Sequence, residues 1–272
     1  MIKNQIEIRT WAQFTETVTD VRFRSWAFRG QADASWPIKS TLSRYLTDFH
    51  VHRDAWSKQE ARLLRIFKRK SHIFLSKLPD PEDSFEWLAI MQHHGAPTRL
   101  LDFTWSPYVA CFFALEMAQK NCAIWAVYPP GLSVRGSRTI RASQTVLPDE
   151  IGPWVKGSYE KYFLTNENSF VFIGEPDNMN QRLIAQSGTF VIPGRLDQPV
   201  NELVDEESIV KITLITEELR KHAMSELYKM NITNATLFPG LDGLAKSLTY
   251  ELETHWAYDP ITMEPYKGFH ID

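Results

Sequence analysis

The sequence has few cysteines and no long apolar run, and each shortage excludes a class of protein. Its 272 residues include Cys111 and Cys122 as the 2 cysteines, too few for a disulfide framework, which points to a reducing compartment. No apolar run approaches the roughly 18 residues of a membrane-spanning helix. The first residues also lack the apolar core of a secretion signal. We therefore expect a cytoplasmic protein that does not enter a membrane.

Several catalytic sequence motifs are also missing. The chain contains no G-x-x-x-x-G-K-[ST] phosphate loop, no G-x-S-x-G nucleophile elbow, no H-E-x-x-H zinc motif and no G-x-G-x-x-G dinucleotide fingerprint. Neither cysteine has a neighbouring cation, so a thiol nucleophile is not expected. Adjacent His93 and His94 do not have a metal-ligand spacing, because neighbours on a helix point about 100° apart. We expect no metal site.

Charge of neither sign dominates, but the two signs are unevenly distributed. The net charge is −3, from 30 Lys and Arg against 33 Asp and Glu, which excludes a uniformly basic polyanion binder. Residues 1–150 carry 20 basic and 15 acidic side chains, whereas residues 151–272 carry 10 and 18. Halves of opposite sign can pack against each other, or one can present a basic face to a polyanion. A hydrophobic content of 43% indicates a globular chain rather than a fibrous or disordered one.

Hydrophobic periodicity predicts an α+β fold. Helices are expected at residues 54–78, 84–94, 108–120, 217–230 and 241–255. Strands are expected at residues 26–29, 122–128, 169–173, 189–192 and 209–215, whereas residues 131–165 are weakly patterned. Ser84 and the pair Ser106-Pro107 are typical of helix starts. The length of 272 residues allows one large domain or two modest ones.

The first of three polar segments is Phe28-Arg29-Gly30-Gln31. An arginine at a strand end can direct its planar fork into a cleft, and that fork suits phosphate, pyrophosphate or carboxylate. The glycine would let a ligand approach the backbone. A structural carboxylate could equally take Arg29, and the spacing alone does not separate the two.

The second and third segments are 92–107 and 181–193. The second combines amide, imidazole, guanidinium, carboxylate and hydroxyl groups, and the free amides after Ser106 would favour an anion. Asp102 and Ser106 can equally serve as helix caps, and one of the two histidines is expected to be structural. In the third segment, alternation around Gly188 predicts a strand or a bulged hairpin. Arg182 and Gln186 would then face a site or line a polar sheet face.

Together these segments resemble the FRG domain family, named for its Phe-Arg-Gly motif, over about residues 25–250. The matching pieces are Phe28 to Gln31 with Trp36 and Arg44, Gln92 to Thr104, Ser106-Pro107 with Ala110 and Phe112 to Ala114, Arg182 with Gln186 and Gly188 to Phe190, and Leu237 to Leu244. Their order is also similar to the arginine–serine–glutamate class of ADP-ribosyltransferases. That class implies a central, split, mostly antiparallel sheet with inserted and C-terminal helices. Because the resemblance covers nearly the whole chain, it also implies a single domain over residues 1–272.

The resemblance implies the roles of the candidate residues. Four are implied to be catalytic: Arg29, Ser106, Gln186 and Asp102. Nine are implied to hold NAD: Arg29, Gly30, Gln31, His93, His94, Thr98, Arg99, Thr104 and Arg182. The catalytic glutamate of that class has no counterpart, because its position falls on or near Arg182. Asp102 and Glu175 are the carboxylates that could replace it.

The function implied is that of an NAD-dependent ADP-ribosyltransferase, with NAD as substrate and no metal. Its acceptor would be a macromolecule, either protein or RNA or DNA, and the enzyme would act as a toxin or an antiviral effector. A toxic enzyme would need a neutralising antitoxin protein. The alternative is a non-catalytic nucleotide- or nucleic-acid-sensing module that uses the basic helix around residues 58–70. A third interpretation is an interaction domain whose motifs are structural.

Overall fold

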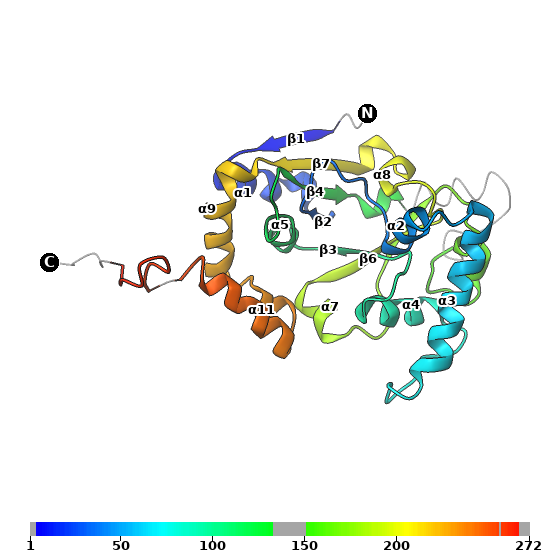
Figure 1. Cartoon of the computed structure of the whole chain (residues 1–272). Coiled ribbons are helices and arrows are strands. Elements are labelled where there is room, and N and C mark those ends of the chain that lie inside the picture. Colours follow the sequence, from blue (N-terminus) through cyan, green and yellow to red (C-terminus); the bar gives the residue numbers. More distant parts are fainter. Residues whose placement is uncertain (1–3, 133–150, 256, 267–272) are drawn as a thin grey trace.

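The computed structural model describes residues 4–132, 151–255 and 257–266, and its centre is a seven-stranded mixed sheet (Figure 1). The strand order is β1-β7-β4-β2-β3-β6-β5. β1 runs parallel to β7, and the other described pairs are antiparallel. The bounds are β1 (Gln5–Ile8), β2 (Ala27–Gln31), β3 (Leu101–Thr104), β4 (Cys122–Val127), β5 (Val171–Gly174), β6 (Gly188–Pro193) and β7 (Ile209–Leu214). The predicted α+β class and mostly antiparallel sheet are confirmed.

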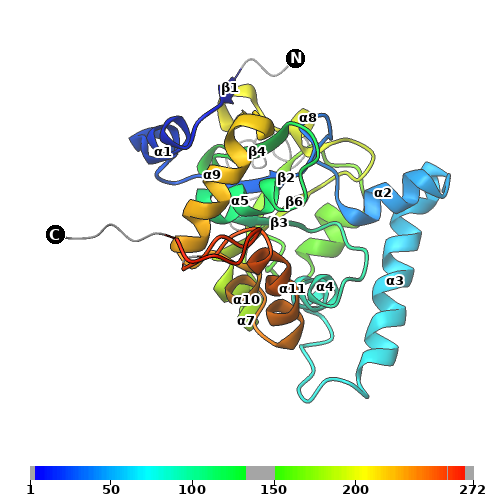
Figure 2. The same ribbon diagram turned by 60° about the vertical axis from the view of Figure 1, so that its left-hand side comes forward.

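Helices gather around this sheet in two groups. α1, α9 and α11 lie toward one end of the sheet and α2, α3 and α4 toward the other, while α5 crosses one face (Figures 1 and 2). The α-helices are α1 (Trp11–Thr19), α2 (Thr41–Asp48), α3 (Trp56–Ser71), α4 (Ser84–His93), α5 (Pro107–Leu115), α7 (Gln181–Ala185), α8 (Val200–Leu203), α9 (Thr216–Lys229), α10 (Asn234–Leu237) and α11 (Leu241–Glu251). Short helical turns are η1 (Val21–Phe23), η2 (Arg53–Ala55), η5 (Glu206–Ser208) and the π-helix η4 (Tyr159–Phe163).

Both faces of the sheet are covered. All six residues of β4 are buried. Its alternate residues Cys122, Ile124 and Ala126 belong to the apolar cluster that contains α5 and α9. Trp125 and Val127 belong to a cluster on the opposite face. This two-residue alternation is what a strand buried on both sides produces.

The N-terminus of α5 forms as its sequence predicts. The Ser106 hydroxyl accepts from the Val109 amide at 3.3 Å, and Pro107 occupies the first turn. α5 then packs directly on β2, where a Cβ added to Gly30 would lie 2.1 Å from the Ala110 carbonyl oxygen. The glycine of the Arg-Gly pair is therefore needed for the approach of a helix. The prediction that Gly30 serves the approach of a ligand is therefore corrected, because α5 fills that space.

Several predicted elements differ from the structure. The helices expected over 108–120 and 241–255 end at Leu115 and Glu251. The strand or hairpin expected over residues 181–193 is wrong in its first half, because 181–185 form α7 and the strand starts at Gly188. The Asn180 side chain caps α7 by accepting from the Leu183 amide at 2.9 Å. The helix expected over 54–78 ends at Ser71, and Asp83 rather than Ser84 caps α4.

Several elements were not predicted from periodicity, among them β1, β3, α1, α2, α8 and α10. Of the weakly patterned segment 131–165, residues 133–150 lie outside the described part, and the rest includes η4. In the described ranges, no helix is both long and apolar enough to cross a membrane. Cys111 and Cys122 are free thiols in the core, and burial raises the pKa of the Cys111 thiol well above its ordinary value.

Candidate functional site

A cleft opens where β2 and β3 diverge. The two strands are joined at the pair Phe28 and Thr104, and beyond that pair they separate. The opening has a volume of about 210 Å³. Nine residues line it: Phe28, Arg29, Gly30, Asp102, Phe103, Thr104, Phe113, Arg182 and Gln186. Candidate residues from three separate segments therefore meet beside the Arg-Gly pair.

Arg29 is the least satisfied polar group of the cleft. Its Nη1 donates to the Asp102 carbonyl oxygen at 2.8 Å, but its buried Nε has no hydrogen-bond partner. Burial lowers the pKa of Arg29, the Asp102 carboxylate opposes that shift, and Arg44 adds to it. A buried N–H without an acceptor costs free energy, so it is a feature that an incoming acceptor would relieve.

A chain of side chains orients the Asp102 carboxylate. The Gln92 amide donates to Asp102 Oδ2 at 2.9 Å, and the Thr98 hydroxyl donates to Gln92 Oε1 at 2.7 Å. Thr98 is itself fully buried and accepts from the Leu100 amide at 3.1 Å. Thr98 therefore acts through Gln92 and does not line the cleft. Gln92, the first residue of the Gln-His-His run, was not among the predicted site residues.

A second guanidinium and a histidine stand at the other wall. Arg182 of α7 lies with its Cζ 4.7 Å from the centre of the Phe238 ring. Arg182 and Gln186 also line a small adjoining hollow that contains His93. Burial lowers the pKa of His93, and the nearby His94 and Arg182 lower it further. His93 is therefore neutral at pH 7, and Arg29 and Arg182 supply the positive charge of the cleft.

Thr104 and Gln186 bind the two walls together. The Thr104 hydroxyl donates to the Gln186 carbonyl oxygen at 2.7 Å and accepts from the Ser106 amide at 3.0 Å. The Gln186 side-chain amide donates to the Leu237 carbonyl oxygen at 3.0 Å. Both residues line the cleft, but the donor groups that could reach a ligand are already engaged. Gln186, predicted to be catalytic, thus links the end of α7 to α10 by a hydrogen bond.

Four further candidates lie away from the cleft. Ser106 is used as the cap of α5, and Gln31 is buried between the Trp125 indole and the Pro37 carbonyl. His94 lines a different, apolar groove beside α3. Arg99 has no exposed surface and lies in the core. The elements that carry these residues direct them away from the cleft, which the linear spacing did not reveal.

Arg99 is paired inside the protein. Its Nε donates to Glu60 Oε1 at 2.7 Å and its Nη1 to the Pro193 carbonyl oxygen at 2.9 Å. Nη2 forms an ion pair with the second Glu60 oxygen, and the Tyr159 hydroxyl donates to Glu60 at 2.6 Å. Burial alone would lower the pKa of Arg99, but Glu60 outweighs it and holds that pKa above its ordinary value. The predicted NAD-binding role of Arg99 is corrected to a structural one.

Of the two carboxylates considered as substitutes for the missing glutamate, Asp102 is the one in the cleft. Glu175 follows β5, accepts from the Trp105 indole at 2.7 Å and lines a separate shallow hollow. Among the described residues that line the cleft, Asp102 carries the one carboxylate. The described part of the chain contains no cluster of three or more potential metal ligands.

Comparison with protein families supports part of the sequence resemblance. Residues 24–122 match the family model of the FRG domain. The match runs from just before β2 to the first residue of β4, so it includes Arg29, Asp102 and the Gln-His-His run, but not Arg182 or Gln186. No curated protein and no solved structure matches the chain.

Proposed function

We propose that the chain is an NAD-dependent ADP-ribosyltransferase that modifies a macromolecule, with the cleft between β2 and β3 as the NAD site. The observation that carries this proposal is the buried Nε of Arg29, which has no partner and borders a cleft that Arg182 also lines. Two guanidiniums around one opening favour a ligand with more than one negative charge. The pyrophosphate of NAD has that chemistry.

The size of the cleft decides how much of the ligand it would hold. Its volume of about 210 Å³ is below the roughly 300 to 1,000 Å³ of pockets that enclose a drug-sized ligand. The cleft would hold the charged middle of NAD, and the rest would extend over the mouth. NAD would supply the ADP-ribosyl group to the acceptor.

Asp102 is the residue to which we assign the missing carboxylate role. Its Oδ2 is held by Gln92, and the carboxylate lies near Arg29. A fixed negative charge there would stabilise positive charge that develops on the ribose during transfer. Gln92 and Thr98 would be positioning residues, because they reach the ligand through Asp102.

Two measurements test the proposal separately. Titration calorimetry with NAD and with ADP-ribose tests binding, and incubation with labelled NAD and cell extract tests transfer. Asp102→Asn should keep NAD binding within a few-fold and lower the transfer rate by about 100-fold or more. Asp48→Asn, which changes an exposed carboxylate on α2, serves as the matched control. Absence of both binding and transfer in the wild type would overturn the proposal.

The second candidate is a non-catalytic module that senses a nucleotide. It is favoured by the presence of Arg182 near the position where the transferase class has its glutamate. This candidate predicts binding of NAD or another nucleotide without label transfer, and no difference between wild type and Asp102→Asn in any extract. If transfer occurs, a toxin or antiviral role in the cytoplasm follows, and expression of wild type but not Asp102→Asn should stop cell growth.

A further inference from the structure

We propose that copies of this chain associate head to tail, with α11 of one copy seated in the apolar groove between α3 and α4 of the next. The inference does not depend on the ligand of the cleft. It rests on two exposed apolar surfaces at different places on the molecule. The two surfaces match in pattern, length and charge.

The first surface is a leucine stripe on α11. Leu241, Leu244, Leu248 and Leu252 are 79%, 52%, 59% and 77% exposed. Their spacing of three, four and four residues places all of them on one side of a helix. Leucines at such positions normally face a core, and an exposed row of them marks an interaction site. Amphipathic helices that bind in grooves present their anchors with this spacing.

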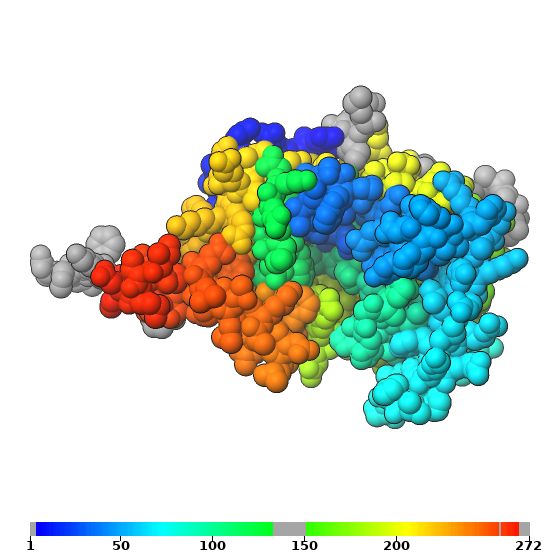
Figure 3. All heavy atoms as spheres, in the orientation of Figure 1, coloured from blue at the N-terminus to red at the C-terminus, as the bar shows by residue number. Residues whose placement is uncertain are grey.

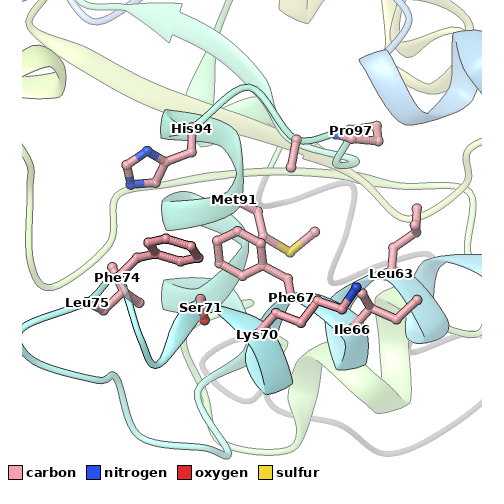
Figure 4. Close-up of a pocket in the computed structure, with 11 residues that line it drawn as sticks. Leu63, Ile66, Phe67, Lys70, Ser71, Phe74, Leu75, Met91, His94 and Pro97 are labelled. Carbon is pink, nitrogen blue, oxygen red and sulfur yellow. The ribbon is translucent and has the colours of Figure 1, made fainter.

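The second surface is the groove beside α3, with a volume of about 430 Å³ (Figure 4). α3 supplies one wall, and Met91, His94 and Pro97 supply the other, with the rings of Phe67 and Phe74 between them (Figure 4). The lining is almost entirely apolar. Phe74, three residues beyond the end of α3, is 81% exposed. Such a groove is of the kind that accepts the apolar face of a helix.

The lengths of the two surfaces agree. α11 has 11 residues, which at 1.5 Å per residue makes a helix of about 16 Å. The α3 wall from Leu63 to Ser71 is about 12 Å long by the same rise, and Phe74 and Leu75 extend it. A helix of the length of α11 can therefore place at least two successive leucines in the groove.

Charge supports the same pairing. Residues 56–78 carry 7 Lys and Arg and 1 acidic residue, Glu60, which forms a buried ion pair with Arg99. Lys70 lines the groove, and the exposed Arg62 and Arg69 directly precede lining residues. α11 carries Asp242 and Glu251 against Lys246, a net charge of −1. A helix of net negative charge facing a basic groove gains attraction that a second basic surface would not provide.

The stripe is a fixed ridge rather than a loose segment. A Cβ added to Gly243 would lie 1.8 Å from the Phe238 carbonyl oxygen, so α11 packs tightly on the end of α10. α10 is itself capped by Thr233. A surface that is already ordered loses less entropy when it binds.

The groove of the same molecule cannot receive the stripe. α11 and α3 lie apart in the ribbon view, and they are separated on the space-filling surface (Figures 1 and 3). The stripe and the groove are different surfaces, so pairing them between copies leaves one of each free on every pair. Such a contact is heterologous, and it continues into rings or filaments instead of stopping at a dimer.

Sedimentation velocity of the wild-type protein over a range of concentrations tests the association. The average mass should rise beyond that of a dimer. Leu248→Glu on the stripe and Phe74→Glu on the groove should each weaken self-association by at least about tenfold. Val21→Glu alters a side chain that is equally exposed elsewhere, at 79%, and should associate like the wild type. Circular dichroism establishes that each variant is folded.

Mixing the two variants tests the head-to-tail geometry. Leu248→Glu keeps an intact groove and Phe74→Glu keeps an intact stripe, so an equimolar mixture should form a 1:1 dimer that does not grow. A mixture that remains monomeric would overturn the proposal, as would a wild type that is monomeric at every concentration. Self-association that persists at the wild-type strength in either Leu248→Glu or Phe74→Glu would also overturn the proposal. Raising the salt concentration should weaken the wild-type association, because it screens the charge attraction.

Discussion

Arg29 and Arg99 are both arginines of polar sequence runs, and the Nε of each is buried, but the protein uses the two side chains in opposite ways. Every nitrogen of Arg99 has a partner in Glu60 or the Pro193 carbonyl, and no part of the residue is exposed. Arg29 has one carbonyl partner and a buried Nε without one, beside an open cleft. The guanidinium of Arg99 is part of the core, whereas the guanidinium of Arg29 still has an N–H that can bind a ligand.

The difference shows that the partners of a buried charge distinguish structure from function better than burial does. A buried charge that is fully paired is destabilised only when the pair is broken. A buried donor with an unmet hydrogen bond is a cost that persists until a ligand meets it. Substitutions at the two arginines should therefore produce contrasting losses, one of stability and the other of binding.

Breaking the core pair should have the largest effect. Arg99→Ala leaves the Glu60 carboxylate buried without its cation, which should lower the free energy of unfolding by about 3–5 kcal/mol. Urea denaturation measures this. Arg62→Ala, an exposed arginine on α3, should change the same quantity by less than about 0.5 kcal/mol. A loss below about 1 kcal/mol for Arg99→Ala would mean that the pair is not structural.

Gly30→Ala should have the next largest effect, and it acts at the floor of the cleft. The added methyl would overlap the Ala110 carbonyl oxygen and the Ala114 amide of α5. Overpacking of this kind costs about 1–3 kcal/mol, because the helix has to move. Urea denaturation measures the loss, and NAD titration should show weaker binding because the Phe113 wall moves with α5. An unchanged stability would show that α5 is not held closely against β2.

The same conservative substitution at the two arginines sharpens the contrast. Arg29→Lys keeps the charge but loses the planar fork, so NAD affinity should fall by about tenfold or more. The free energy of unfolding should change by about 0.5–1.5 kcal/mol, the worth of one hydrogen bond. Arg99→Lys should instead lower the free energy of unfolding by more than Arg29→Lys does, and it should leave the NAD affinity nearly unchanged. Equal binding losses in the two variants would contradict the separation of roles.

The smallest effect concerns the pH dependence of His93. Burial lowers the pKa of this histidine in the folded state below its value of 6.5 in the unfolded chain. As the pH falls, the unfolded chain therefore binds a proton at His93 before the folded protein does. The contribution of neutral His93 to the free energy of unfolding is thus complete above pH 6.5 and is lost as the pH falls below that value. Urea midpoints at about pH 7.5 and about pH 5.5 should differ less in His93→Gln than in the wild type. His50→Gln, at an exposed loop histidine, should retain the wild-type difference.

Local features of the sequence predicted local structure well. Ser106-Pro107 predicted the start of α5, because a cap depends on atoms within three residues. Asn180 carried an equally local signal for α7 that the alternation around Gly188 obscured. Leu101 to Thr104 form β3, which was not predicted from periodicity. Four residues give too little periodicity to separate a short strand from a loop.

The amino-acid sequence alone determined the α+β class, most of the helix and strand positions, and the presence of cationic side chains in the FRG-like segments. The tertiary structure decided which of those side chains share a cleft. Arg29 meets Asp102 across 73 residues of chain, and Arg99 meets Glu60 across 39. Contacts over such separations follow from how strands pair and diverge, and the split between β2 and β3 is a property of the assembled sheet.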